Sequence, residues 1–227
     1  MKYLIFSYDD GVRQDIRLIE LFKKYGLKAT FNLNSGSLGH TGHIVHGGFD
    51  VCFDKVRADE IGQIYEGFEV ACHGVEHRNF PSLTEEELDR EVVVDKQTLE
   101  TLSGQTILGG AYPCGVYDME IPARLRARGI FYCRTINDTH TFAVPEDFAL
   151  WHPTCHDHDA RALDLADRFL ALESEQDSVF YIWGHAFEFD KNDCDRWYAM
   201  EKLCEKLAGH SDVCYCTNGD IYRALQK

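Results

Sequence analysis

Residues 3–11 read Tyr3-Leu4-Ile5-Phe6-Ser7-Tyr8-Asp9-Asp10-Gly11, a short apolar run followed by two carboxylates and a glycine. The run from Tyr3 to Ser7 has the length and composition of a strand. After Gly11, apolar residues recur at helical spacing as far as Gly26, a residue type that commonly follows the end of a helix. The opening of the chain therefore predicts one strand followed by one helix.

The same alternation continues along the chain. We expect further strands at 29–33, 68–72, 106–111, 130–135, 148–152, 179–183 and 213–216, and further helices at 84–102, 122–129, 160–173 and 195–208. Strands that alternate with helices form parallel sheets joined by right-handed crossovers. The fold class is therefore α/β, and we expect a distorted (β/α) barrel of about seven strands. Residues 34–66 are predicted to be an insertion over one rim, within a single domain that covers 1–227.

The composition is that of an acidic globular protein. Apolar residues make up 44% of the 227 residues, and Asp and Glu number 38 against 23 Lys and Arg, for a formal charge of -15. Because such a surface repels phosphate groups and anionic lipid, we expect neither a nucleic-acid nor a membrane partner.

The compartment is predicted from the chain start and the cysteines. Met1 to Phe6 is too short and too soon followed by carboxylates for a signal peptide, and no apolar run approaches the roughly 20 residues of a membrane span. The nine cysteines are an odd number in a large chain, which favours reduced thiols. We expect a cytoplasmic protein, whereas the sequence leaves the oligomeric state open.

Polar side chains gather at the ends of predicted strands, where barrel enzymes place their chemistry. Asp9 and Asp10 end the first strand, and His73 ends another, with His77 four residues on. On a helical turn this spacing puts both imidazoles on one face, and one added carboxylate gives the three-ligand set of a catalytic zinc site. The residues alone leave alternatives open: a simple Asp-Asp-Gly turn, and a pair of surface histidines.

Four motifs, in order from residue 7 to residue 185, resemble those of the polysaccharide deacetylases, the NodB-homology family or carbohydrate esterase family 4. They are Ser7-Tyr8-Asp9-Asp10-Gly11, His73-Gly74-Val75-Glu76-His77, Ala111-Tyr112-Pro113-Cys114-Gly115 and Ile182-Trp183-Gly184-His185. Each motif is weak singly, but four in family order at strand ends are specific. The resemblance implies a barrel of the NodB-homology type and a metal-dependent hydrolase.

The resemblance also implies a role for each matched residue. Asp10, His73 and His77 would hold a divalent metal, commonly zinc, with cobalt or nickel also used. Asp9 would be the general base and His185 the general acid, while the backbone N–H of Cys114 would help to hold the oxyanion. Such a metal activates water and polarises a carbonyl group.

The sequence departs from the family pattern around the base. The third motif usually opens with an arginine that orients the base, but Ala111 stands there. We hypothesise that Arg134, at another strand end, replaces it; the alternative is a surface ion pair. Cys114 stands where tyrosine is usual. The Asp-rich motif that ends in Trp has only Asn137-Asp138 and Trp151 as its nearest remnants.

Several further residues are candidates for substrate binding: Tyr112, Arg134, Trp151, His152, His156 and Trp183. The segment from Trp151 to His158 is dense in potential ligands, so it predicts a substrate wall or a second metal site with His152 and His156. A solvated loop is the alternative, and we favour it over the second metal. Trp183 fits either a wall of the acetyl pocket or plain core packing.

The expected activity is hydrolysis of an N-acetyl group from an amino sugar or a related carbohydrate. The lack of a signal peptide argues against mature cell-wall polymer as the substrate. The alternatives are cleavage of another C–N bond, as in a cyclic imide, a ureide or a small amide, and hydrolysis of an O-acetyl ester. A protein of another class, an inactive carbohydrate-binding module, is favoured by the missing arginine but disfavoured by the presence of Asp9 and His185.

Overall fold

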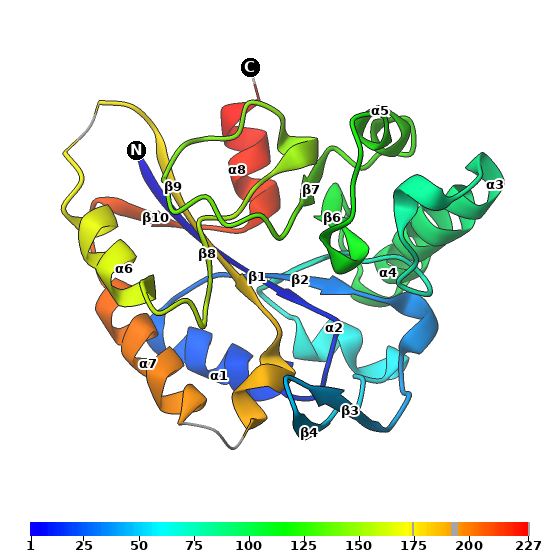
Figure 1. Cartoon of the computed structure of the whole chain (residues 1–227), viewed down its shortest axis with the longest axis horizontal. Coiled ribbons are helices and arrows are strands. Elements are labelled where there is room, and N and C mark those ends of the chain that lie inside the picture. The colour runs from blue at the N-terminus through cyan, green and yellow to red at the C-terminus, as the bar shows by residue number, and fades with distance from the viewer. Residues whose placement is uncertain (174, 192–194, 227) are drawn as a thin grey trace.

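The computed structural model describes residues 1–173, 175–191 and 195–226. Within them, eight strands form one sheet in the order β7-β6-β5-β2-β1-β9-β8, with β10 paired to β1 (Figure 1). Neighbouring strands of this sheet are parallel, which confirms the expected α/β fold and distorted (β/α) barrel. The strands are β1 (Lys2–Asp9), β2 (Thr30–Leu33), β5 (Glu69–Cys72), β6 (Gly109–Ala111), β7 (Tyr132–Arg134), β8 (Cys155–His156), β9 (Ser178–Gly184) and β10 (Val213–Tyr215).

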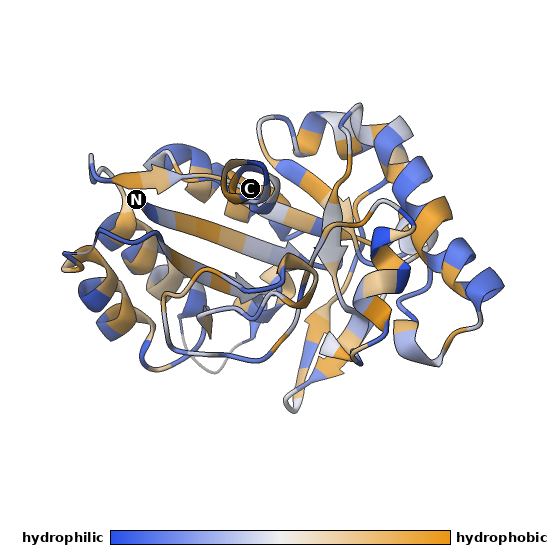
Figure 2. Ribbon diagram, turned by 90° about the horizontal axis from the view of Figure 1, so that it is seen from above, coloured by the Kyte–Doolittle hydropathy of each residue, from blue (hydrophilic) through white to orange (hydrophobic). Residues whose placement is uncertain are grey.

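Helices surround this sheet and bury its outer face. They are α1 (Asp15–Tyr25), α2 (Ile61–Ile64), α3 (Glu85–Leu88), α4 (Asp95–Ser103), α5 (Ile121–Arg126), α6 (Ala162–Leu170), α7 (Arg196–Leu207) and α8 (Asn218–Leu225). Figure 2 shows apolar residues along the strands, while the helices carry both apolar and hydrophilic stripes. This amphipathic pattern is what lets each helix cover the sheet on one side and face water on the other. None of the described helices is long and apolar enough to span a bilayer.

The first strand, β1, lies in the middle of the sheet and separates two environments. Leu4, Phe6 and Tyr8 join the larger core, whereas Ile5 belongs to a smaller cluster that includes Tyr181. Because side chains alternate along a strand, the polar residues Ser7 and Asp9 lie on the same face as Ile5. Asp9 and Asp10 are therefore presented in different directions.

The sheet is completed by an irregular segment between β7 and β9. Trp151 pairs with Arg134 in an isolated parallel bridge, and four residues later β8 pairs with β9. The strand predicted at 148–152 is wrong, because Phe148–Leu150 forms a 3-10 turn and the strand starts only at Cys155. The side chain of Asp147 caps this turn by accepting the backbone N–H of Ala149, an interaction that competes with extended structure.

The insertion expected at 34–66 lies beside the first strand end. It contains an antiparallel hairpin, β3 (His43–His46) and β4 (Phe49–Cys52). The chain after the hairpin returns to the turn that follows β1: Val12 pairs with Lys55, and the Val56 N–H donates to the Gly11 carbonyl. The insertion thus holds the segment that carries Asp10.

Candidate metal centre and active site

Asp10, His73 and His77 converge on one point beyond the ends of β1 and β5. One potential ligand atom from each lies within 4.8 Å of the others, and the Nε2 atoms of the two histidines are 3.1 Å apart. The Nδ1 of His73 lies 2.9 Å from the Ala111 carbonyl, to which it donates, so its Nε2 keeps a free lone pair. Burial, followed by the neighbouring His73, lowers the pKa of His77 to about 4, which keeps this imidazole neutral. This donor set fits a zinc-type cation.

His73 and His77 are brought together by a loop. The prediction that a helical turn places both imidazoles on one face is wrong. Residues 73–77 are irregular, and both Gly74 and His77 have positive φ, at 81° and 58°. The φ of Gly74 favours glycine, and a Cβ there would also lie 2.8 Å from a Glu91 carboxylate oxygen. The left-handed bends turn the two rings toward each other.

Two acidic side chains hold this loop from one helix. Asp95 accepts the backbone N–H groups of His73 and Gly74, each at 3.1 Å, and the buried Glu91 accepts that of Glu76 at 3.0 Å. A π-helical turn, Asp89–Val94, joins α3 to α4 and carries Glu91 just before Asp95. Turns of this kind frequently occur at functional sites. Sequence reasoning predicted one regular helix here and missed both side chains.

Asp10 occupies a backbone conformation that is uncommon outside glycine, with φ at 79°. The Nζ of Lys55 donates to the Asp10 carbonyl at 2.8 Å and lies 3.8 Å from its carboxylate. Burial raises the pKa of Asp10, but Lys55 and the nearby histidines outweigh it and the pKa falls below its usual value. Lys55 therefore positions this carboxylate, a role that no motif indicated.

Asp9 is buried beside this group and is paired with Arg134, as hypothesised from the sequence. The guanidinium of Arg134 donates to Asp9 Oδ2, while the Asn32 amide donates to Oδ1 at 2.8 Å. Arg134 is fully buried and also stacks on Trp183, with its guanidinium carbon 4.6 Å from the ring centroid. Burial raises the pKa of Asp9, but Arg134 and the two nearest histidines hold it well below its usual range. Asp9 is thus a carboxylate at neutral pH.

His185 follows β9 and faces the same carboxylate. Its Nε2 lies 3.9 Å from Asp9 Oδ2, and the Nε2 of His73 lies 3.8 Å from that oxygen. On the other side, His185 Nδ1 is 4.0 Å from Glu188, a buried carboxylate. Trp183 contacts the His185 ring edge to face, with centroids 5.7 Å apart, and donates to Asp138. Asp138 was one of the weak motif remnants in the sequence.

A pocket of about 430 Å³ opens beside Asp10 and His77, lined also by Asn34, Lys55 and Phe53. The residues predicted to bind substrate are not gathered around it. Tyr112 is buried and donates to the Ala149 carbonyl, and His156 contacts Glu188.

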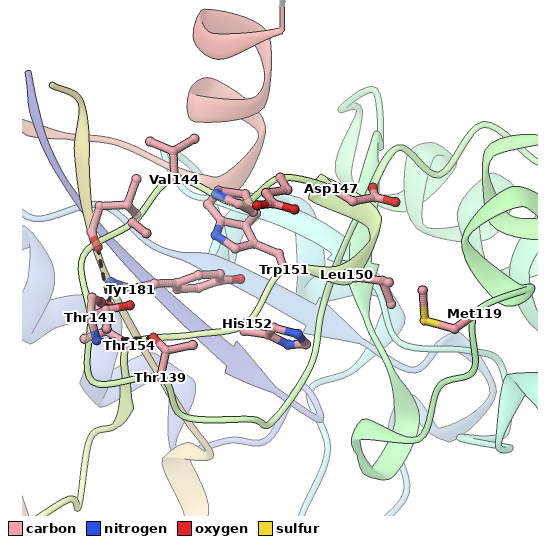
Figure 3. A pocket seen from close by; sticks show the side chains of 14 residues that line it. Met119, Thr139, Thr141, Val144, Asp147, Leu150, Trp151, His152, Thr154 and Tyr181 are labelled. Atoms are coloured by element: carbon pink, nitrogen blue, oxygen red, sulfur yellow. Dashed lines mark hydrogen bonds between the residues drawn. The ribbon is translucent and has the colours of Figure 1, made fainter.

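Trp151 and His152 line a second pocket of about 410 Å³, drawn in Figure 3. This pocket has no lining residue in common with the one beside Asp10. His152 is held by Thr135, whose Oγ1 lies 2.7 Å from its Nδ1, and Trp151 is buried against Tyr181.

Cys114, proposed to supply an oxyanion N–H, is exposed and has a left-handed backbone with φ at 54°. It lies in the turn after β6, between Pro113 and Gly115. The other cysteines of the described chain are likewise free thiols, as the sequence predicted.

Comparisons with known proteins show the family of this chain. The family model described as polysaccharide deacetylase matches residues 1–132, more than half of the chain. YxkH of Bacillus subtilis, assigned by its name to the polysaccharide deacetylases, is 25% identical over 120 residues; the match covers 52% of this chain and 39% of YxkH. The chain thus spans well under half the length of this curated relative.

Two solved structures share the fold. A Mycobacterium smegmatis protein assigned to the polysaccharide deacetylases superposes with a TM-score of 0.68 at 15% identity, covering 99% of this chain and 90% of the other. A family 4 carbohydrate esterase from Streptomyces lividans, solved in complex with acetate, superposes with a TM-score of 0.57 at 17% identity, covering 93% and 90%.

Proposed function

Because the chain belongs to the polysaccharide deacetylase family, we propose that it hydrolyses an N-acetyl group of an amino sugar or a related carbohydrate. Asp10, His73 and His77 would hold a divalent metal, zinc in preference to cobalt or nickel. The observation that carries the proposal is the position of Asp9 Oδ2, which lies 3.8 Å from a ligand histidine and 3.9 Å from His185. A base that is flanked in this way can act on a group bound at the metal.

The proposed roles follow from these contacts. When bound, the metal would polarise the acetyl carbonyl and acidify a water molecule. Asp9 would accept a proton from the attacking water, since the low pKa keeps it ionised and Arg134 and Asn32 fix its carboxylate. His185 would deliver a proton to the departing nitrogen, so that water and amide yield acetate and an amine. The N–H of Cys114 would stabilise the oxyanion.

Arg134 acts in this scheme as a positioning residue. It approaches Asp9 from β7, whereas the family arginine would come from position 111 on the neighbouring strand β6. One guanidinium nitrogen of Arg134 donates to Asp9, while the other two donate to Ser7 and to the Thr135 carbonyl, so the charged group is fixed beside the carboxylate. The missing arginine is therefore no argument for an inactive carbohydrate-binding module, because an equivalent charge contacts the base.

The alternatives within the same chemistry are an O-acetyl ester, a cyclic imide or ureide, and a small amide. All would use the same base and metal, so they differ only in what fits the pocket that Phe53 and Lys55 line. That pocket has room for a sugar ring next to Asp10, which supports the carbohydrate substrate.

The experiment that tests the proposal is an acetate-release screen of the full chain over N-acetylated sugars, O-acetylated sugars and small amides. The protein is stripped with a chelator and then reloaded with zinc or cobalt. We expect release only after reloading, and loss of release in Asp9→Asn at unchanged metal content. A reloaded protein that releases acetate from none of these compounds overturns the proposal.

A further inference from the structure

We propose that this chain has a second divalent metal site, formed by Asp157, His158 and Glu188 and separate from the Asp10–His73–His77 centre. Asp157 and His158 follow β8, and Glu188 lies in the 3-10 turn Ala186–Asp190 after β9. The two segments are neighbours because β8 and β9 pair in parallel. The inference is independent of the proposed deacetylase activity.

Three donor atoms of these residues approach one another as metal ligands do. His158 Nδ1 lies 3.2 Å from Asp157 Oδ1 and is hydrogen-bonded to Glu188 Oε2 at 3.1 Å in the metal-free chain. Ligand atoms about 2.1 Å from one cation at tetrahedral angles are separated by about 3.4 Å, so these two spacings are close to those of ligands that share a cation. Counting His156, four side chains place a possible ligand atom within 4.8 Å of one another.

A buried oxygen without a hydrogen-bond donor points to the same centre. The Asp157 side chain is fully buried, and its Oδ2 accepts the Tyr8 hydroxyl at 2.8 Å. Its Oδ1 has no hydrogen-bond partner, although nitrogen atoms of His156 and His158 lie 3.1 and 3.2 Å away. Those nitrogens therefore lie near the oxygen without aiming a proton at it. A buried carboxylate oxygen left this way is costly unless a cation binds it.

We infer that His156 contacts the metal ligands and does not itself bind the metal. Its Nδ1 lies 3.1 Å from the backbone nitrogen of His158, and its Nε2 lies 3.2 Å from Glu188 Oε2. A histidine in this position orients a ligand carboxylate. Gly184 packs closely against the Asp157 side chain, because a Cβ on Gly184 would lie 2.5 Å from Asp157 Oδ2.

The donor chemistry selects the class of cation. One imidazole and two carboxylates suit a first-row divalent ion such as Zn²⁺ or Co²⁺, and its charge offsets the two buried carboxylates. The other oxygen of Glu188 is 4.0 Å from His185 Nδ1 and 3.4 Å from Lys191. The second ion would thus fix the carboxylate of Glu188, which faces His185, the proposed general acid.

The test counts metal ions per chain, without any activity measurement. The full chain is saturated with Zn²⁺, dialysed, and analysed for zinc by mass spectrometry. We expect two ions in the natural protein, one in His158→Ala, one in His77→Ala and none in the double variant. Asp157→Asn, which keeps the size of the side chain, guards against a folding defect in His158→Ala and should also lose one ion. Co²⁺ added to His77→Ala should give the visible bands of a protein-bound ion, absent from the double variant.

Two further variants separate this site from its surroundings. His156→Ala should still bind two ions at saturation but hold one of them about 10- to 100-fold more weakly, as loss of an outer-shell partner does. His140→Ala is the matched control, because His140 forms a neighbouring group with Asp138 and Asp159; it should keep both ions.

Specific outcomes decide the matter. A zinc ion retained in His77→Ala and lost in His158→Ala supports the second site even if the deacetylase screen finds no activity. The proposal is overturned if the natural protein binds a single ion that His77→Ala abolishes, which would leave Asp157, His158 and Glu188 as an ion-pair network only. It is also overturned if His140→Ala loses the second ion.

Discussion

Arg134 and Asp9 are 125 positions apart in the chain, yet the guanidinium of Arg134 donates directly to the Asp9 carboxylate in a fully buried pair. The contact depends on the sheet order, because β7 and β1 approach across the barrel interior and not as neighbouring strands. Ser7, on the same face as Asp9, also lies 3.3 Å from Arg134 Nε.

We predict that Arg134→Lys lowers kcat about 10- to 100-fold with little change in KM, because a lysine cannot reproduce the three donors that hold the guanidinium between Asp9, Ser7 and the Thr135 carbonyl. Arg134→Ala should lose more activity and destabilise the fold by about 3–5 kcal/mol, because it leaves a buried carboxylate unpaired. The informative measurement is kcat against pH: the acid limb should move to higher pH in Arg134→Lys as the pKa of Asp9 rises. A purely structural role for Arg134 would leave that limb in place.

A second prediction concerns Asp95, which accepts N–H groups from both sides of the metal loop. Asp95→Ala should weaken zinc binding at the Asp10–His73–His77 centre by about 10- to 100-fold, since the loop loses its anchor. Competition with a chromophoric chelator measures this affinity. Lys96→Ala, a change at the next position where the side chain binds Glu100, is the control and should leave zinc affinity unchanged.

Asp15 provides a prediction for the dependence of stability on pH. Burial raises its pKa to about 8, and Tyr65 donates to its Oδ2 at 2.7 Å. Because the unfolded chain releases this proton near pH 4, folding takes up a proton between about pH 4 and 8. This contribution to stability is fully present at the acid end and is lost as the pH rises toward 8, by up to about 1.4 kcal/mol per pH unit.

Asp15→Asn should remove that slope while keeping a side chain that accepts from Tyr65. Urea unfolding of the metal-free protein between pH 5 and 8.5 gives both curves. If the curves of the natural protein and of Asp15→Asn run parallel over this range, Asp15 is ionised in the folded state and the prediction fails.

Two glycines with the same backbone conformation should respond differently to alanine. Gly11 and Gly26 have φ of 61° and 67°, so each substitution costs about 1 kcal/mol in backbone strain. A Cβ on Gly11 would also lie 2.9 Å from Leu33 Cδ2, whereas one on Gly26 meets nothing within 4 Å. Gly11→Ala should therefore be clearly more destabilising in thermal unfolding, and it alone should reduce zinc binding by Asp10.

The strands and helices of this fold could be predicted where apolar periodicity was strong. The run before Asp9 and the one before His185 gave correct strands, because buried parallel strands are continuously apolar. The segment 148–152 was wrong since Asp147 caps a turn there. The missed hairpin β3–β4 has strands of only four residues, HIVH and FDVC, which are mostly exposed or half-exposed and too short to show a clear period-2 pattern.

The candidate site could be predicted from motifs for the residues that follow strands directly. Asp10, His73 and His77 converge as the motifs implied, although through left-handed loop residues that spacing rules do not describe. Glu91, Asp95 and Lys55 could not be found, because each acts through the loop backbone from a segment distant in sequence. The role of Arg134 could be hypothesised only because Ala111 stands where the family motif has an arginine.

The pairing of β1 with β9 has a consequence for how this protein is made. Seven residue pairs join the two strands, while β10 holds the beginning of β1. During synthesis, the strand that carries Asp9 leaves the ribosome well before β9, its longest partner, which is complete only when residue 184 emerges. Such long-range pairing slows folding and leaves apolar edges open in the meantime. We therefore expect fragments that end before β9 to aggregate, and expression at lower temperature to improve the yield of the full chain.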